Sequence, residues 1–297
     1  MVFEQPVIFF SHGVRLTGRL FRNSLQVQDP QPAAIVTGSW LTVKEQMPAL
    51  YAKRLAERGI TAFTFDFTGF GESDGAPRQL EMPTRKIQDL RAAAAFLSTF
   101  SGADANRLGH VAVCASAQYG LAAWSDTPQV THFASVAGWY HNSATVAPFY
   151  GGIDGIVSRL GVAAKATDRL IRTGEVTTVP AYDPSNADAG MAFELDYYAQ
   201  PARGAVPQWK NAMAAMSWFY WLTFDGMRAA SRVRTPTLLI HGDDCVLPEN
   251  VKTVHKALAG PKRLIWMEGT QTDFYDQPLQ VDRAIAEIAA FLNEPQR

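Results

Sequence analysis

Hydrophobic and polar positions along the chain predict alternating strands and helices. Apolar and polar residues alternate over residues 14–21 after the apolar run 7–10, which predicts an N-terminal antiparallel hairpin. Later strands are continuous apolar runs, which is typical of a parallel sheet covered by helices on both faces. The runs are residues 33–36, 61–65, 110–114, 133–137, 236–240 and 264–267. Apolar spacing and terminal Pro or Gly residues predict helices at 48–59, 84–98, 119–124, 248–258 and 281–292.

The alternation stops after residue 138 and resumes at Pro236. Residues 139–231 are rich in aromatic residues, Ala and Gly and carry no strand signal. We therefore predict a doubly wound, mostly parallel α/β sheet formed by residues 1–138 and 232–297, with residues 139–231 as an inserted helical lid. Most lid aromatics are expected to form the lid's own core. Their density, with few charges, favours a pocket for an apolar acyl or aromatic group.

Composition and charge exclude several classes of partner. The 297 residues carry 27 basic and 28 acidic side chains, so the concentrated positive field that nucleic acids require is absent. The apolar run 7–10 is far shorter than the roughly 20 residues that span a bilayer, so no membrane association and a cytoplasmic location are expected. No CxxC or HExxH pattern supports a metal, and no cofactor is expected. The expected partner is a small-molecule substrate, and a homodimer is left open.

Residues 111–119 join a buried strand directly to a helix, which is the context of a nucleophile elbow. This turn and four other segments, in the expected order, resemble the α/β-hydrolase superfamily and more narrowly its dienelactone-hydrolase-like branch. The segments are Gly38-Ser39-Trp40, Lys44-Glu45-Gln46, residues 66–71, Cys114-Ala115-Ser116 and Asp273-Phe274-Tyr275-Asp276. The resemblance covers nearly the whole chain and implies the α/β-hydrolase fold. The elbow departs from the branch because it lacks the usual glycines.

The resemblance implies that Cys114 is the nucleophile, with Ser116 as the competing candidate. A serine nucleophile at position 116 would place the bulky Gln118 where the strand and helix approach closely. An unperturbed thiol is already partly ionised at pH 7, and the first turn of a helix is expected to stabilise the thiolate further. The alternative is that Cys114 is a small buried core residue. The chain contains only one other cysteine, Cys245. Two cysteines are too few for a disulfide framework.

The resemblance also assigns the groups around the nucleophile. The oxyanion hole is expected from the backbone N–H of Ala115 and that of Ser39 or Trp40, although Trp40 could equally form a pocket wall or core. Asp244 is the candidate triad acid, although two adjacent aspartates after a strand are also common in turns. Gln271 stands where the branch carries its histidine. Glutamine cannot take up a proton near neutral pH, so the catalytic relay is incomplete.

One of the six histidines could replace the missing base. Ligands of open α/β sheets bind at the carboxyl ends of the strands, and His141 follows such an end as the chain enters the lid. We therefore predict a catalytic or binding role for His141, with a solvent-facing position as the alternative. The neighbouring Trp139 and Tyr140 are candidate substrate contacts.

Three functions fit these residues. The first is acyl transfer from a small ester, lactone or thioester through Cys114, as a hydrolase or an acyltransferase. The second, motivated by Gln271, is a non-catalytic binding protein on a hydrolase scaffold. The third is a lyase or cyclisation reaction in which the oxyanion hole polarises a carbonyl. The fold alone cannot separate them.

Overall fold

A computed structural model describes residues 1–126 and 128–294 and contains an eight-stranded sheet. In spatial order the strands are β1 (Phe3–Ser11), β2 (Val14–Arg22), β4 (Thr61–Phe65), β3 (Gln31–Thr37), β5 (Ala103–Val113), β6 (His132–Val136), β9 (Thr237–His241) and β10 (Lys262–Trp266). β1 and β2 form an antiparallel hairpin, and β2 also pairs with β4 in antiparallel fashion. The remaining neighbours in this sheet pair in parallel. The predicted hairpin and parallel sheet are thus confirmed.

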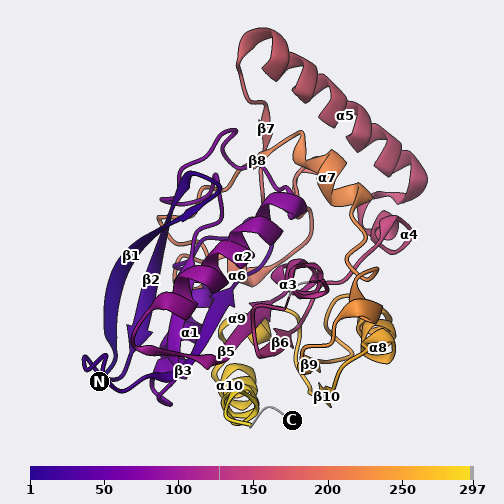
Figure 1. The fold of residues 1–297 in the computed structure, drawn as a ribbon. Coiled ribbons are helices and arrows are strands. Elements are labelled where there is room, and N and C mark those ends of the chain that lie inside the picture. Colours follow the sequence, from indigo (N-terminus) through magenta and orange to yellow (C-terminus); the bar gives the residue numbers. More distant parts are fainter. Residues whose placement is uncertain (127, 295–297) are drawn as a thin grey trace.

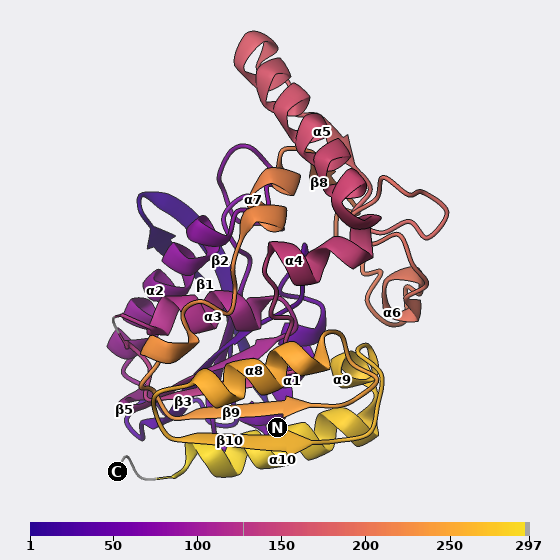
Figure 2. The ribbon, with the colours of Figure 1, turned by 90° about the vertical axis from the view of Figure 1, so that its right-hand side faces the viewer.

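Helices cover both faces of this sheet. They are α1 (Met47–Ala56), α2 (Pro83–Thr99), α3 (Ser116–Trp124), α8 (Pro248–Ala257), the short α9 (Asp273–Asp276) and α10 (Pro278–Leu292). α1 packs against α10, and α2 packs against α3. Figure 2 shows α8 and α10 on opposite faces of β9 and β10. Proline in the first helical turn of α1, α2, α8 and α10 preorganises these starts, because an N–H there needs no intrahelical partner.

The chain between β6 and β9 lies outside the eight-stranded sheet. It contains α4 (Ser143–Val146), the 3-10 helix η1 (Ala147–Tyr150), α5 (Gly152–Thr173), β7 (Thr178–Val179), α6 (Asp196–Ala199), β8 (Met213–Ala214), α7 (Ser217–Thr223) and the 3-10 helix η2 (Ala230–Arg232). α5 projects away from the sheet in both views (Figures 1 and 2). β7 and β8 pair with each other. These two strands were not predicted, because two residues are too few to show an alternating pattern.

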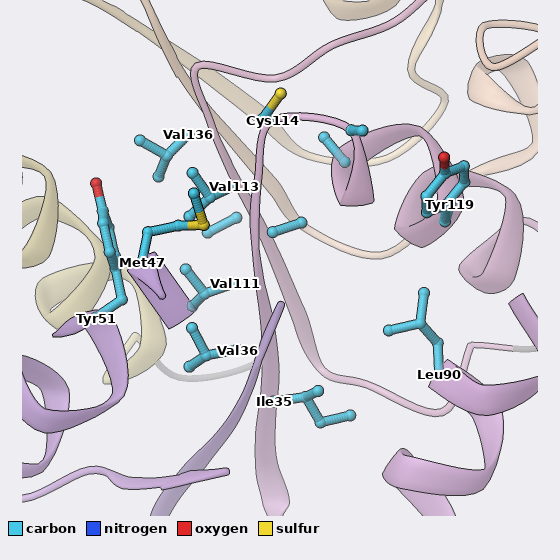
Figure 3. Close-up of a cluster of buried hydrophobic side chains, with 14 of the residues drawn as sticks. Ile35, Val36, Met47, Tyr51, Leu90, Val111, Val113, Cys114, Tyr119 and Val136 are labelled. Atoms are coloured by element: carbon cyan, nitrogen blue, oxygen red, sulfur yellow. The ribbon is translucent and has the colours of Figure 1, made fainter. Parts of the chain in front are cut away.

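The path of the chain through β3 and β5 positions the functional site. From β3 the chain crosses to β4 on one side, and it later returns to β5 on the other side. The loops that follow β3 and β5 therefore meet at one edge of the sheet, where doubly wound folds bind ligands. Figure 3 shows Val111, Val113 and Cys114 in succession along β5 and the turn after it, with α1 residues on one side and Leu90 and Tyr119 on the other.

Candidate active site

Cys114 occupies the turn between β5 and α3 in a strained backbone conformation. Its φ angle of +59° lies in the left-handed region, which residues other than glycine rarely adopt. Neighbouring hydrogen bonds hold it there: its N–H donates to the carbonyl of Val136 at 3.0 Å, and its own carbonyl accepts from the N–H groups of Ala117 and Trp139, both at 3.0 Å. Strain that is held in this way is typical of functional sites, and this geometry matches a nucleophile elbow.

The two candidate nucleophiles differ in their surroundings. Cys114 lines a cavity at the carboxyl edge of the sheet. The hydroxyl of Ser116 instead donates to the carbonyl of Val113 at 3.1 Å, and Ser116 is not among the residues that line that cavity. Of the two candidates, only Cys114 lines the cavity.

The cavity around Cys114 is small and mostly apolar. It holds about 40 Å³. None of the described residues that line it is Lys, Arg, Asp or Glu, and no histidine is among them. A larger hollow of about 370 Å³ lies at the opposite edge, where β6, β9 and β10 begin, and contains none of the candidate residues. The Cys114 cavity is lined by Ser39, Trp40, Cys114, Trp139, Tyr150, Met191, Phe193, Leu195, Tyr198, Trp221, Val246, Gln271 and Tyr275.

Burial raises the pKa of the Cys114 thiol. The hydroxyls of Ser39 and Tyr275 and the backbone N–H groups of Ala115 and Trp40 oppose that rise because they stabilise the thiolate. The net direction differs from our expectation that the start of α3 would favour ionisation, since removal of the sulfur from water outweighs the helix. Burial raises the pKa of Cys245 to about 12. These four groups therefore favour the thiolate of Cys114 in part.

The loop after β3 supplies two of these groups, the Ser39 hydroxyl and the Trp40 N–H, and an ion cluster around the buried Lys44 fixes that loop. Lys44, which is 1% exposed, contacts Asp66 at 2.7 Å, Glu72 at 2.6 Å and Glu45 at 2.8 Å. Asp66 also accepts the backbone N–H of Lys44 at 2.8 Å. A Cβ at Gly71, where φ is +45°, would lie 2.2 Å from the Asp66 carboxylate, so this turn requires glycine.

Gln271 lies in the cavity and is held by three hydrogen bonds. Its Oε1 accepts the backbone N–H of Val246 at 3.1 Å, and its Nε2 donates to the carbonyl of Ala137 at 2.8 Å and to the hydroxyl of Tyr275 at 3.2 Å. The structure therefore brings Gln271 and Cys114 to one cavity. Asp244 is solvent-exposed and does not line it. The backbone of Val246 orients Gln271 instead.

His141 is fully buried outside the cavity, contrary to a position on its rim. Its Nδ1 accepts the indole N–H of Trp139 at 2.7 Å, and its Nε2 donates to the carbonyl of Trp221 at 2.8 Å. Burial lowers its pKa to about 4. Both ring nitrogens are engaged, so the ring offers no lone pair to Cys114 in this arrangement. Trp139 lines the cavity, whereas Tyr140 is buried outside it.

Two tyrosines at the site were not singled out from the sequence. Tyr275 belongs to the Asp-Phe-Tyr-Asp segment, which could have indicated it, and its hydroxyl lies 3.2 Å from that of Ser39. Tyr198 belongs to the short helix α6 and also lines the cavity. No pattern in residues 139–231 distinguishes Tyr198 from the other aromatics.

Within the described residues, no group of three or more His, Cys, Asp and Glu side chains is arranged to hold a metal ion. The same part of the chain contains no helix of sufficient length and apolar character to cross a bilayer.

The alpha/beta hydrolase family model matches residues 9–284, so the chain belongs to this family. It is 28% identical to the uncharacterized protein PA2218 of Pseudomonas aeruginosa, over 95% of this chain and 78% of that protein. The crystal structure of PA2218 superposes with a TM-score of 0.85 at 24% identity, over 99% of this chain and 94% of that one. This likeness supports the α/β-hydrolase fold.

Two further relatives carry functional names. The chain is 27% identical to the polyketide transferase claH of Penicillium crustosum, over 85% of this chain and 84% of the relative. It is 25% identical to the thiohydrolase aneE of Aspergillus aculeatus, over 86% of this chain and 82% of the relative. With the family match, these relatives show an enzyme of the hydrolase or acyltransferase type.

Proposed function

We propose that this enzyme, a member of the dienelactone-hydrolase-like branch with Gln271 at the histidine position, transfers a small apolar acyl group through a thioester intermediate on Cys114. The observation that carries the proposal is that Cys114, in a strained strand-to-helix turn, lines a cavity. The N–H groups of Ala115 and Trp40 also lower the pKa of its thiol in part. The same two N–H groups would stabilise the oxyanion that forms when the sulfur attacks a carbonyl.

The absence of an imidazole from the described cavity lining favours thioesters over alkyl esters as acyl donors. The Cys114 sulfur bonds to the carbonyl carbon, the bond from that carbon to the leaving sulfur breaks, and the Cys114 proton passes to the leaving thiolate. A thiolate is a good leaving group that needs no general acid, whereas an alkoxide is far more basic. A site without a strong base is therefore matched to thiol exchange. Lactones and activated esters are the next candidates.

The same reasoning favours transfer over hydrolysis in the second step. Release of the acyl group by water requires a base to remove a proton from water, and such bases contribute about 10² to 10⁴ in rate. A more nucleophilic acceptor, such as a thiol or an amine, depends less on that base. Of the two named relatives, the polyketide transferase agrees with this preference, whereas the name thiohydrolase indicates hydrolysis.

Intact mass spectrometry after incubation with short-chain acyl thioesters tests the proposal. We expect an acyl adduct on the wild-type protein and on Ser116→Ala, but not on Cys114→Ala. A matched panel of alkyl esters should acylate the wild type more slowly. Adducts that persist in Cys114→Ala, or turnover by that variant at the wild-type rate, would contradict the thiol mechanism and favour lyase or cyclase chemistry.

A further inference from the structure

We infer that the otherwise apolar acyl group carries one uncharged oxygen close to the reacting carbonyl, and that the hydroxyl of Tyr198 donates a hydrogen bond to that oxygen. This inference names the substrate class of the Cys114 site and rests on the proposed function. It is carried by two buried donors of the cavity that find no partner in the described chain.

The first donor is the Tyr198 hydroxyl. Tyr198 is 3% exposed and lines the cavity with Cys114. The hydroxyls of Ser39 and Tyr275 lie near it, yet no group among residues 1–126 and 128–294 meets hydrogen-bond geometry with the Tyr198 oxygen. Buried polar groups are nearly always paired, and an unpaired one costs stability, so the position of Tyr198 points to a ligand.

The second donor is the indole N–H of Trp40. Trp40 also lines the cavity, and its Nε1 is buried without a partner in the described residues. The other two cavity indoles are satisfied, because Trp139 donates to His141 at 2.7 Å and Trp221 donates to the hydroxyl of Tyr150 at 3.0 Å. An indole N–H can only donate, so any group that pairs with Trp40 Nε1 must be a hydrogen-bond acceptor.

The acceptor is uncharged and close to the reacting carbon. The described cavity lining includes no cationic side chain to offset a carboxylate or phosphate, and burial of an unpaired charge is costly. Cys114 and Tyr198 line the same cavity of about 40 Å³, so the acceptor and the reacting carbon lie in one small space. A keto, hydroxyl or ether oxygen one or two carbons from the thioester carbonyl meets both conditions, and a 3-oxoacyl thioester is the simplest example.

The test compares acetoacetyl and butanoyl thioesters of one small thiol, which differ only in the 3-oxo group. We expect Tyr198→Phe to lower kcat/KM for the acetoacetyl thioester about tenfold more than for the butanoyl thioester, because only the first loses a hydrogen bond. The ratio between substrates cancels their different intrinsic reactivities. Tyr198→Phe should also unfold at the same or a higher temperature than wild type, because it removes an unpaired hydroxyl.

Tyr182→Phe is the matched control. The Tyr182 ring lies 5.9 Å from that of Tyr198, but Tyr182 does not line the cavity and its hydroxyl is 3.4 Å from the N–H of Leu195. This variant should not change the ratio between the two substrates. An equal loss on both thioesters in Tyr198→Phe would place its hydroxyl at the thioester itself and overturn the inference.

A binding measurement separates this inference from the proposed function. The Cys114→Ala protein cannot be acylated at that position, and the tryptophans of the cavity report occupancy by fluorescence. We expect it to bind the acetoacetyl thioester about tenfold more tightly than the butanoyl thioester, and the additional Tyr198→Phe change should remove this preference. Equal binding of the two thioesters by Cys114→Ala contradicts the inference, whether or not the wild type forms an acyl-enzyme.

Discussion

Gln271 donates a hydrogen bond from Nε2 to the hydroxyl of Tyr275 at 3.2 Å, and this contact decides where the phenol proton points. The amide orientation is fixed, because Oε1 accepts a backbone N–H and Nε2 also donates to a backbone carbonyl. The oxygen of Tyr275 therefore accepts from Gln271, and its proton is directed toward Ser39 or Cys114. A phenol in this place stabilises a thiolate, but it does not supply the base that an imidazole would provide.

Gln271→His should therefore add the missing base. We expect faster loss of the acyl adduct from Cys114 in water, measured by time-resolved intact mass spectrometry. General-base catalysis sets an upper bound of about 10² to 10⁴, and the gain should be far smaller because Asp244 is exposed and does not orient position 271. Transfer to the native acceptor should fall or stay unchanged, since three hydrogen bonds of Gln271 are altered.

Gln280→His is the matched control, because it introduces a histidine nine residues further along the chain, in α10. Gln280 donates to the carbonyl of Glu268 and does not line the cavity. It should leave the lifetime of the adduct unchanged. A folded Gln271→His protein with the wild-type lifetime would show that position 271 does not act on the Cys114 adduct.

The sequence predicted the elbow because its signal is local. A buried strand that runs into a helix through Cys114 is visible within nine residues, and the positions of Trp40 and Gln271 followed from segments in a familiar order. His141 and Tyr198 could not be placed in this way. The surroundings of His141 depend on the carbonyl of Trp221, 80 residues further along the chain. Tyr198 lines the Cys114 cavity through the packing of residues 139–231, which have no regular hydrophobic period.

Lys44→Met should strongly destabilise the fold. Lys44 is 1% exposed, and its loss leaves the fully buried Asp66 without its 2.7 Å partner. Removal of one member of a buried ion pair typically costs about 3–5 kcal/mol. The free energy of unfolding in urea should fall by that amount. In the folded fraction, the rate of Cys114 acylation should also fall, because the loop that carries Trp40 loses its anchor.

Lys252→Met is the matched surface control. Lys252 pairs with Glu249 at 2.7 Å, but both side chains are solvent-exposed. Its loss should change the free energy of unfolding by less than about 1 kcal/mol. Equal effects of the two substitutions would show that the Lys44 cluster does not stabilise the protein.

Two glycines of the projecting helix α5 should respond oppositely to alanine. Gly152 has a φ of +71° and Gly161 has ordinary helical geometry, and a Cβ at either position meets no atom within 4 Å. Gly152→Ala should cost about 1–2 kcal/mol of local stability because of its left-handed backbone, whereas Gly161→Ala should add about 1 kcal/mol. Hydrogen exchange of α5 amides should slow in Gly161→Ala and quicken in Gly152→Ala. Identical exchange in both variants would contradict this assignment of strain.

Stability should fall with acidification because burial lowers the pKa of four histidines, His110, His132, His141 and His241. His110 accepts the indole N–H of Trp124 at Nδ1, at 3.0 Å, and its Nε2 lies 2.8 Å from the hydroxyl of Thr37. Burial lowers the pKa of His110 to about 3 and the pKa values of His141 and His241 to about 4. None of these rings gains a buried carboxylate partner that would favour protonation.

The unfolded chain binds protons at His110, His141 and His241 near pH 6.5, whereas the folded chain does so only near pH 3 to 4. The free energy of unfolding should therefore be greatest above pH 6.5 and should decrease as the pH falls toward 4. Each histidine contributes a slope of about 1.4 kcal/mol per pH unit once its unfolded form is fully protonated. Burial raises the pKa of Asp89, which opposes the decrease in part, because protonation of that carboxyl favours the folded state.

Urea unfolding at a series of pH values between 7.5 and 4.5 measures this dependence. His241→Asn provides an internal test, because it keeps a hydrogen-bonding side chain opposite the carbonyl of Val246 but cannot titrate in this range. Its slope below pH 6 should be smaller than that of the wild type by the contribution of one histidine, whatever its stability at pH 7.5. A wild-type free energy of unfolding that stays constant between pH 6.5 and 5 would show that these rings are already protonated in the folded protein, and the neutral hydrogen-bonding pattern of His110 and His141 would then have to be abandoned.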